Sequence, residues 1–539
     1  MSNPRVANDS PGPGGPGITG PSQAAGPVRL ASNSAKQSIS MLTPAQVSSR
    51  LRENEESYLV DRGKGVLRYD VAQLPSNNPI EDDRSERVVQ VPLIVEPSGS
   101  TSSGSNSNSG SGNGVSEKSE VASGGETGEN GETMVSSDWM FWGVYDGHSG
   151  WTTSAFLRDH LVAYVLNELD KVYEKSSPNS MYRLVPSPEV IDEAIQQGFL
   201  ALDDEIVNKR VARLLESSGS SKASATELIA PALSGSCGLL AFYDTFSKNL
   251  RVAVTGDSRA VLGSRDSYGN WTATALSTDQ TGSNIDEANR VRSEHPGEEN
   301  TAIRNGRVLG SLEPTRAFGD ARYKWARDIQ HKIAQRFFGR RIPSELKTPP
   351  YVTAKPVVTT TKVNPENGDF LVMGSDGVFE MLSNEEVVSL VVQWLKAKRP
   401  EYLETTLKSS QSDGSGLFSK LFGSGKRSDR DDGALVEDIS SNKEAQKQPI
   451  RRRNGVPVRF TVQDDNAATH IIRNALGGAD QDQVSMLVSI PSPLARNYRD
   501  DLTVTVVFFG HDSTPSNDAG SIKVNQAGTR NGIRARSRL

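Results

Sequence analysis

The stretch Trp139-Met-Phe-Trp-Gly-Val-Tyr-Asp-Gly-His-Ser-Gly150 is the most informative part of the chain. Its first six residues are almost entirely apolar, which is typical of a buried strand. The strand runs into Asp146, Gly147 and His148, so a carboxylate, a glycine and an imidazole meet at its end. Such a group can hold a metal ion and supply a proton. The alternative interpretation is an ordinary strand-to-helix turn, because Asp-Gly is a common turn sequence.

The composition narrows the class of protein. At 539 residues the chain has room for one large domain or two to three average ones. No run of eighteen apolar residues is present, so a membrane-spanning helix is not expected. The net charge of −6 gives no reason to expect nucleic acid as a partner. Cys237 is the only cysteine, which excludes an intramolecular disulfide framework and a zinc site built from cysteines.

Four segments have too few apolar residues to offset the entropy of ordering them. We expect a disordered N-terminal segment at residues 1–45, low-complexity inserts at 97–136 and 408–456, and a disordered tail at 511–539. Residues 46–510 would then form one domain interrupted by the two inserts. The N-terminal segment is poor in acidic residues, like a mitochondrial presequence. Its run of Pro and Gly at 11–17 cannot form the amphipathic helix of such a presequence, so the targeting question stays open.

The rest of the chain mixes helical and β-type patterns. Apolar residues recur with helical spacing over 157–169 and 191–206, and Ser187 and Pro188 suit the start of the second helix. Ser383 and Glu386 form the capping box of a later helix. Short β-type runs occupy residues 238–243, 250–254, 259–263, 271–276, 370–373 and 502–509. The close spacing of the first four favours antiparallel meanders and therefore an α+β sandwich covered by helices.

Acidic residues stand at strand ends or turns in five segments: Glu81-Asp82, Asp146, Asp257, Asp376 and Asp500-Asp501. Two carboxylates about 4 Å apart repel by roughly 4 kcal/mol at an effective dielectric constant near 20. A fold that gathers them therefore needs cations. Oxygen ligands without cysteine favour Mg²⁺ or Mn²⁺ over zinc. Two such ions can clamp a phosphoryl group for in-line attack.

In their order along the chain these segments resemble the motifs of the metal-dependent protein phosphatase type 2C (PPM) family. The matching stretches are Val144-Tyr-Asp-Gly-His148, Thr255-Gly-Asp-Ser-Arg-Ala-Val-Leu262, Thr315-Arg-Ala-Phe-Gly-Asp320, Gly374-Ser-Asp-Gly-Val378 and Asp500-Asp-Leu-Thr-Val504. The resemblance implies a PPM-type α-β-β-α sandwich of two antiparallel sheets flanked by helix pairs. It also implies hydrolysis of phosphoserine or phosphothreonine by a metal-bound hydroxide, with two Mg²⁺ or Mn²⁺ ions and no phosphoenzyme.

The resemblance further implies roles for single residues. His148 would be the general acid that protonates the departing serine or threonine oxygen. Asp146 would bridge both ions, and the Gly147 carbonyl would ligate one of them. The full set of metal-site residues implied is Glu81, Asp82, Asp146, Gly147, Asp376 and Asp500.

Other residues near these motifs are given structural roles. We expect Asp257 and Arg259 to pin the turn at Gly256 rather than to bind metal. Arg316 and Asp320 either form a buried pair with each other or support the site. Cys237 opens an apolar strand and is expected in the core, because the arginine that a cysteine phosphatase needs six residues later is replaced by Tyr243.

Asn77 indicates a subfamily. In the general family an arginine four residues before the first motif's glutamate grips the substrate phosphate, and here that position is Asn77. The stretch Gln73–Asp82 resembles fungal-type catalytic subunits of pyruvate dehydrogenase phosphatase, as do 309–325 and 349–356. This resemblance implies the phosphorylated pyruvate dehydrogenase complex as substrate and the mitochondrial matrix as location, with the cytoplasm as the alternative. An amide binds phosphate more weakly than a guanidinium, so we expect docking to a large complex to supply affinity.

Two competing functions are kept open. One is a PPM phosphatase with a different phosphoprotein substrate in the cytosol or nucleus. The other is an inactive PPM scaffold that binds partners. An inactive relative is expected to lose metal carboxylates, whereas Asp146, Asp376 and Asp500 are all present together with His148.

Overall fold

The computed structural model describes residues 39–95, 126–127, 133–174, 183–216, 221–403, 440–441, 459–510 and 521–530. The chain divides into two units, Met1–Ser40 and Met41–Leu539. Nearly all of the first unit lies outside the described residues, so the description below concerns the second. The first helix, α1 (Pro44–Leu51), begins inside the segment expected to be disordered up to residue 45, with Thr43 and Gln46 forming a capping box.

One sheet has eight strands in the order β18-β12-β11-β17-β19-β2-β1-β20, and its centre is built from both ends of the domain. All its pairs are antiparallel except that of β12 with β18. Its strands are β1 (Glu56–Asp61), β2 (Val66–Leu74), β11 (Arg259–Arg265), β12 (Trp271–Ala275), β17 (Phe370–Gly374), β18 (Ser440–Ser441), β19 (Leu502–Phe509) and β20 (Ser521–Val524).

A second, seven-stranded sheet follows the order β16-β10-β9-β5-β3-β7, with β4 paired to β5. The pair of β3 and β5 is the longest, running from Asp83 opposite Tyr145 to Val95 opposite Thr133. Only β3 and β7 are parallel. The strands are β3 (Asp83–Val95), β4 (Glu126–Thr127), β5 (Thr133–Tyr145), β7 (Arg183–Leu184), β9 (Gly238–Asp244), β10 (Asn249–Thr255) and β16 (Val357–Lys362).

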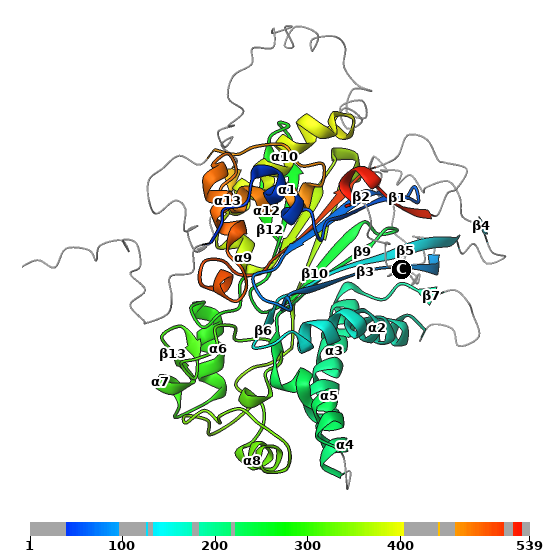
Figure 1. The fold of residues 1–539 in the computed structure, drawn as a ribbon. Coiled ribbons are helices and arrows are strands. Elements are labelled where there is room, and N and C mark those ends of the chain that lie inside the picture. The colour runs from blue at the N-terminus through cyan, green and yellow to red at the C-terminus, as the bar shows by residue number, and fades with distance from the viewer. Residues whose placement is uncertain are drawn as a thin grey trace, which may run out of the picture. The chain divides into compact units, whose positions relative to one another are not determined.

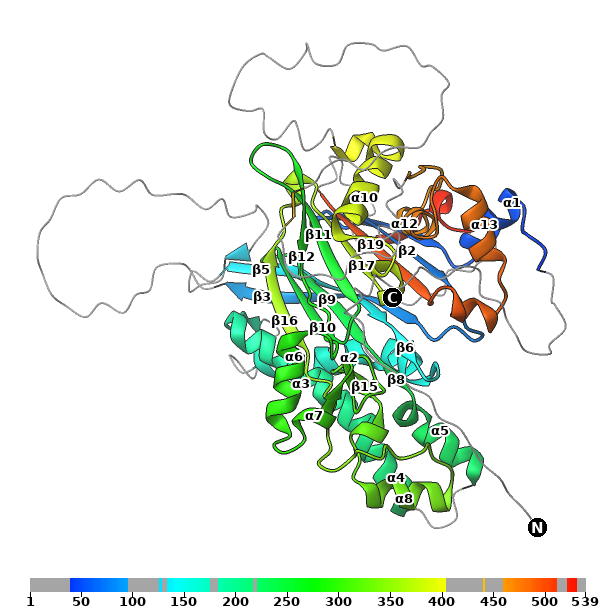
Figure 2. The same ribbon diagram turned by 90° about the vertical axis from the view of Figure 1, so that its left-hand side faces the viewer.

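The two sheets pack face to face, and each is covered by helices on its other side (Figures 1 and 2). Residues such as Val71, Trp142 and Val252 fill the space between the sheets. The helices over the eight-stranded sheet are α1, α10 (Asn384–Lys398), α12 (Ala467–Ala475) and α13 (Gln481–Ser489). Those over the seven-stranded sheet are α2 (Thr152–Glu174), α3 (Pro188–Asp204), α4 (Arg210–Glu216) and α5 (Lys222–Leu233), with a π-helical turn at Glu205–Lys209. The predicted α-β-β-α sandwich is therefore confirmed.

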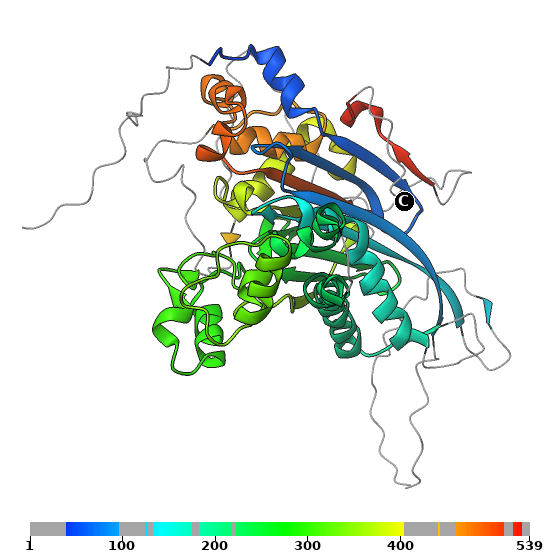
Figure 3. The same cartoon turned by 60° about the horizontal axis from the view of Figure 1, so that its bottom comes forward.

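A lobe at one end of the sandwich contains α6 (Ile285–Glu294) and α7 (Glu299–Ala302), joined by the short pair β13 (Ile303–Arg304) and β14 (Arg307–Val308). We call residues 285–312 the α6–α7 lobe, and its apolar residues form a separate cluster together with residues between 317 and 352, such as Tyr323 and Tyr351. It lies at the end of the sheets where a small three-stranded sheet is found (Figure 2), and Figure 3 shows its green helices with this end of the domain turned toward the viewer. That sheet consists of β6 (Gly147–His148), β8 (Gly235–Ser236) and β15 (Phe318–Gly319). The helix α8 (Arg327–Arg336) follows β15 and packs against the α2–α5 layer through Ile333.

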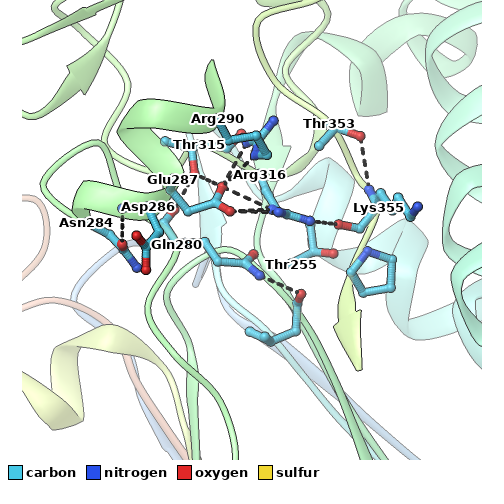
Figure 4. A network of polar contacts seen from close by, with 12 residues as sticks. Thr255, Gln280, Asn284, Asp286, Glu287, Arg290, Thr315, Arg316, Thr353 and Lys355 are labelled. Carbon is cyan, nitrogen blue, oxygen red and sulfur yellow. Dashed lines mark hydrogen bonds and ion pairs between the residues drawn. The ribbon is translucent and has the colours of Figure 1, made fainter. Parts of the chain in front are cut away.

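Glu287 anchors the α6–α7 lobe to the segment before β15 (Figure 4). It accepts hydrogen bonds from Thr315 Oγ1 at 2.7 Å, Arg290 Nη2 at 2.8 Å and Arg316 Nη2 at 2.7 Å. Burial raises the pKa of Glu287, but these partners outweigh it and bring the pKa to about 2. Arg316 also donates to the carbonyl of Lys355 at 2.8 Å. The hydrogen bonds and the ion pair of Glu287 with Thr315 and Arg316 therefore hold the α6–α7 lobe against the segment that leads into β15.

Most expected elements lie where the patterns put them. The four strands of the meander are β9 to β12, residues 370–373 and 502–509 lie in β17 and β19, and the helical stretches are α2 and α3. The capping box of Ser383 and Glu386 opens α10. Ser187 is the N-cap of α3 by backbone conformation, without a side-chain hydrogen bond. Among the described residues no helix has the length and apolar character needed to cross a membrane.

The expectation of a disordered tail over 511–539 is wrong for residues 521–530. Ser521–Val524 forms β20 and pairs with β1, and Ile522 and Val524 pack against the core between the sheets. Alternating apolar residues give this short stretch a face to bury, which its polar neighbours concealed. Most of both inserts lies outside the described residues. Within them, β4, the start of β5 and β18 are strands.

Candidate active site

The site begins where β5 ends. Asp146 follows the strand, and its backbone carbonyl accepts a hydrogen bond from Cys237 N at 2.8 Å. Gly147 and His148 then form β6 and pair with β8. A Cβ atom on Gly147 would lie 2.1 Å from the carbonyl oxygen of Glu81. Only glycine permits this approach, which brings the segment of Glu81 against the end of β5.

Three carboxylates from distant parts of the chain meet at this point. Asp257 follows Gly256 in the turn between β10 and β11, and Asp376 begins the short helix α9 (Asp376–Phe379) directly after β17. One ligand atom from each of Asp146, Asp257 and Asp376 lies within 4.8 Å of the others. The backbone N–H of Asp376 donates to Asp146 Oδ2 at 3.2 Å, which fixes α9 against the end of β5.

The electrostatics of this group call for a cation. Burial raises the pKa of Asp146, Asp257 and Asp376, that of Asp257 to about 6, and neighbouring carboxylates raise the pKa of each further. Within the described part of the chain no lysine or arginine forms an ion pair with any of the three. Asp376 Oδ1 is buried without a hydrogen-bond partner there. Oxygen donors of this kind suit Mg²⁺ or Mn²⁺, so the residues fit the metal that the motifs imply.

Glu81 and Asp82 approach the group from the connection between β2 and β3. Asp82 is buried and accepts a hydrogen bond from Thr503 Oγ1 at 2.7 Å. Burial raises its pKa well above the usual range, and the charge of Asp501 raises it further. Burial followed by Asp501 likewise raises the pKa of Glu81. Asp82 also exerts the largest charge effect on Asp146, so the two lie in one acidic centre.

Asp500 and Asp501 take different positions. Asp500 forms an ion pair with Arg496. It lies beside α9, because a Cβ atom on Gly377 would come within 3.0 Å of Asp500 Cβ. It is not in the group of three. Asp501 instead accepts backbone N–H groups of the first motif, from Ser76 at 2.5 Å and Glu81 at 2.8 Å.

Asn77 is also bound to Asp501. Its backbone N–H donates to Asp501 Oδ1 at 3.1 Å and its side-chain amide to Oδ2 at 3.3 Å. The side chain predicted to contact the substrate phosphate therefore already fixes the loop that carries Glu81. An arginine at this position would bring a charge that the amide lacks.

His148 faces a carboxylate of its own. Its Nε2 lies 2.6 Å from Asp320 Oδ2. Burial lowers the pKa of His148, but the charge of Asp320 and this hydrogen bond outweigh it, so the net pKa is raised. Asp320 follows β15, and β8 separates β15 from β6 in the small sheet. A protonated imidazole beside the carboxylate group can serve as a general acid.

The comparisons with known proteins agree with this geometry. The family model described as "Protein phosphatase 2C" matches residues 106–414. The chain belongs to the protein phosphatase 2C family. Glu81, Asp82 and Asp500 lie outside the matched range, and the fold brings them to the matched motifs. The protein is accordingly a protein serine/threonine phosphatase of a metal-dependent family.

Three similar relatives cover most of the chain. The mitochondrial pyruvate dehydrogenase phosphatase 1 of Saccharomyces cerevisiae is 41% identical over 92% of this chain and 78% of its own. A protein phosphatase 2C homolog of Schizosaccharomyces pombe is 39% identical over 86% of this chain and 84% of its own. The human mitochondrial pyruvate dehydrogenase phosphatase 1 is 30% identical over 87% of this chain and 83% of its own.

Within this protein phosphatase 2C domain, the residues given structural roles take clear places. Arg259 binds Asp279 and Asn384. The Gly256 turn is held by Gln280, whose backbone N–H donates to the Gly256 carbonyl at 2.9 Å and whose side chain accepts from Gly256 N at 2.8 Å. Cys237 is buried, and its thiol donates to Asp257 Oδ1 at 3.1 Å. Asp257 was expected only to support the turn, yet its carboxylate belongs to the group of three. The signal was present, because Asp257 stands just after the end of a strand, as Asp146 and Asp376 do.

Arg316 and Asp320 do not pair with each other, which corrects the first of the two predicted alternatives. Arg316 binds Glu287, and Asp320 binds His148. The second alternative, support of the site, describes Asp320. Sequence reasoning missed this contact because 172 residues separate its partners.

Proposed function

We propose that the protein hydrolyses phosphoserine on the pyruvate dehydrogenase complex in the mitochondrial matrix, using two Mg²⁺ or Mn²⁺ ions. Two of the three relatives above are named mitochondrial pyruvate dehydrogenase phosphatases, which supports the substrate and the organelle. The observation that carries the proposal is the group of Asp146, Asp257 and Asp376, with the unpartnered Asp376 Oδ1, beside the pair of His148 and Asp320.

The acidic residues would hold the ions. Asp146, Asp257 and Asp376 supply carboxylate oxygens at one point, and Gly147 supplies a carbonyl. Bound divalent cations stabilise charge on the phosphoryl group and activate water. The remaining residues proposed to contribute from the surrounding segments are Glu81, Asp82 and Asp500.

The side chains of the protein itself orient the reaction. His148 donates a proton to the serine oxygen as its bond to phosphorus breaks, so serine leaves as a neutral alcohol. Asn77 is held by Asp501 and offers no positive charge to the phosphate. Binding of the phosphate group alone is therefore weak, and docking of the large substrate complex supplies the affinity.

Metal-dependent phosphate release tests the proposal. Phosphorylated pyruvate dehydrogenase complex and an unrelated phosphoserine protein are compared at equal concentration, with Mg²⁺, with Mn²⁺ and with EDTA. A strong preference for the complex, lost in EDTA, is the expected result. Equal rates on the two proteins would retain the phosphatase and reject the complex as the preferred substrate. No release from either would favour an inactive scaffold.

A phosphatase that acts on another phosphoprotein remains the second candidate. It is favoured by the relative of Schizosaccharomyces pombe, whose name gives the family and no substrate. The comparison of the two phosphoproteins separates the candidates directly.

A further inference from the structure

Asp320 occupies a position built for one contact. Gly235 of β8 is the reason that its carboxylate can reach His148. A Cβ atom at position 235 would lie 2.1 Å from His148 Nε2 and 2.3 Å from Asp320 Oδ2. Any side chain there would enter the hydrogen bond between the two residues. The contact therefore depends on a glycine in the strand that separates β6 from β15.

The backbone under Asp320 is held in an unusual conformation. Gly319 and Asp320 both have positive φ, 67° and 49°. The Asp320 N–H donates to the carbonyl of Ser234 at 2.8 Å, and the Gly319 N–H donates to Asp203 Oδ1 at 2.9 Å. A non-glycine residue keeps a left-handed conformation only where its surroundings impose it, and such residues gather at functional sites.

A buried ion pair between Lys324 and Asp203 supports the same turn. Lys324 Nζ lies 2.8 and 2.7 Å from the two carboxylate oxygens of Asp203 and donates to the carbonyl of Ala317 at 2.8 Å. Asp203 comes from α3 and Lys324 from the segment after β15. Three distant parts of the chain thus fix the direction of the Asp320 carboxylate.

We infer that Asp320 is the positioning residue of the general acid His148, holding the imidazole by Nε2 so that Nδ1 delivers the proton. The inference rests on the proposed function and names a residue outside the metal-site set. In the described part of the chain Nε2 of His148 is bound only to Asp320, and no hydrogen bond engages Nδ1. A histidine whose ring is held by a carboxylate at one nitrogen presents its other nitrogen in a defined direction.

The atoms balance in this step. A bond forms between a water oxygen and phosphorus, and the bond between phosphorus and the serine oxygen breaks. The attacking water keeps one proton in the phosphate product and releases the other to solvent. The Nδ1 proton of His148 moves to the serine oxygen, and the neutral imidazole regains a proton from solvent. The Asp320 carboxylate hydrogen-bonds to the imidazole and takes no part in the bonds that form and break.

The leaving group provides the test. Full-length Asp320→Asn and wild type are assayed with Mn²⁺ on a phosphoserine peptide and on p-nitrophenyl phosphate, whose nitrophenolate leaves without a proton. We expect kcat on the peptide to fall by about 10²- to 10³-fold, as for loss of general acid catalysis. On p-nitrophenyl phosphate kcat should change by less than about fivefold, and KM should be nearly unchanged on both. The same pattern in His148→Asn, with no further loss in the double variant, would support the pairing.

Asp464→Asn is the matched control. Asp464 is 5% exposed and Asp320 4%, and Asp464 binds Arg473 in the helical layer over the other sheet. This variant should keep the wild-type ratio of the two rates. If Asp320→Asn does not fold, Gly235→Ala tests the same contact by inserting a methyl group between the partners.

The outcomes separate the inference from the function. Equal losses on both substrates, or no loss on the peptide, in an active background would overturn the role of Asp320 and leave the phosphatase in place. Wild type inactive on both substrates would reject the proposed function itself. Loss confined to the substrate with the poor leaving group supports both.

Discussion

At the scale of single residues, Asp376 is the carboxylate of the proposed metal site for which burial and repulsion are least compensated by hydrogen bonds. Burial and the charges of Asp146 and Asp257 raise its pKa, and its Oδ1 has no hydrogen-bond partner in the described chain. These are properties of a ligand that is stable only with its cation. We therefore expect activity and stability to depend on the same ion.

Replacing Asp376 with Asn should lower phosphate release by more than about 100-fold, since even supporting residues of metal sites cost 10–100-fold. Without metal the variant should melt at or above the wild-type temperature, because one of three repelling carboxylates is gone. Thermal melting with EDTA and with Mg²⁺ measures both effects, and Mg²⁺ should stabilise wild type more. The exposed Asp286→Asn serves as control. Unchanged activity in Asp376→Asn would refute the metal assignment.

His470 of α12 provides a test of pH dependence away from the site. Its Nε2–H donates to the carbonyl of Leu390 at 3.1 Å, and Asn474 Nδ2 lies 3.2 Å from Nδ1, so the neutral ring is satisfied on both sides. Burial lowers its pKa to about 4. The unfolded chain takes up the proton first on acidification. The stability due to His470 is thus present above about pH 6.5 and is lost as the pH falls toward 4.

Between pH 7.5 and 5.0 this histidine should remove about 2 kcal/mol from the free energy of unfolding. Urea unfolding of wild type and His470→Gln at the two pH values measures the effect, and the variant should show a shallower dependence by that amount. His331→Gln, at an exposed position of α8, should keep the wild-type slope. Parallel slopes for wild type and His470→Gln would show that the ring does not titrate as argued.

At the scale of elements, the two-residue strand β8 separates the strands that carry the proposed general acid, His148, and its partner, Asp320. A methyl group in Gly235→Ala would occupy the space between His148 and Asp320. We expect kcat on a phosphoserine peptide to fall by about 10² or more, while Mn²⁺ affinity measured by calorimetry stays within a few fold. Overpacking should also cost about 1–3 kcal/mol of stability. Equal loss of Mn²⁺ binding would show instead that β8 supports the metal site.

The elements that could be predicted from sequence are those with a local period. The meander of β9 to β12 alternates strands and turns within about forty residues. The start of α10 is marked by a capping box. β20 was not found in this way, because two apolar residues, Ile522 and Val524, are too few to stand out among their polar neighbours. Its partner in the described part of the chain, β1, lies more than 450 residues earlier. Periodicity carries no information about such pairing.

The same limit applies to the site. Asp146 and Asp376 stand out in the sequence because each comes just after an apolar strand and directly before a glycine. Asp320 has no such signal, since its role comes from β6, β8 and β15 lying side by side. Arg316 was recognised as charged and placed near a motif, but its partner Glu287 belongs to α6 of the α6–α7 lobe.

At the scale of the whole molecule, the C-terminal segment completes the eight-stranded sheet. Beyond pairing with β1, Asn525 and Thr529 hydrogen-bond with Ser57, and Asn466 donates to the carbonyl of Gly528 at 2.9 Å. Removing residues 511–539 would leave β1 as an open edge and should lower the free energy of unfolding by at least about 3 kcal/mol, at about 1 kcal/mol for each of these three hydrogen bonds, with the loss of the β1–β20 ladder in addition. Removing only 531–539 is the control and should have little effect. Equal stability of the two truncated proteins, measured by urea unfolding, would contradict this role.

The central position of β19 has a consequence for biosynthesis. This strand lies between β17 and β2, so the sheet stays open until one of the last described strands is in place. Asp500 and Asp501 precede β19 directly, and Asp501 holds the loop of Glu81 from the other end of the domain. A chain emerging from the ribosome, or threading through a membrane pore, therefore has no assembled site until residue 509 is free to fold. We therefore expect a partly made molecule to have no phosphatase activity.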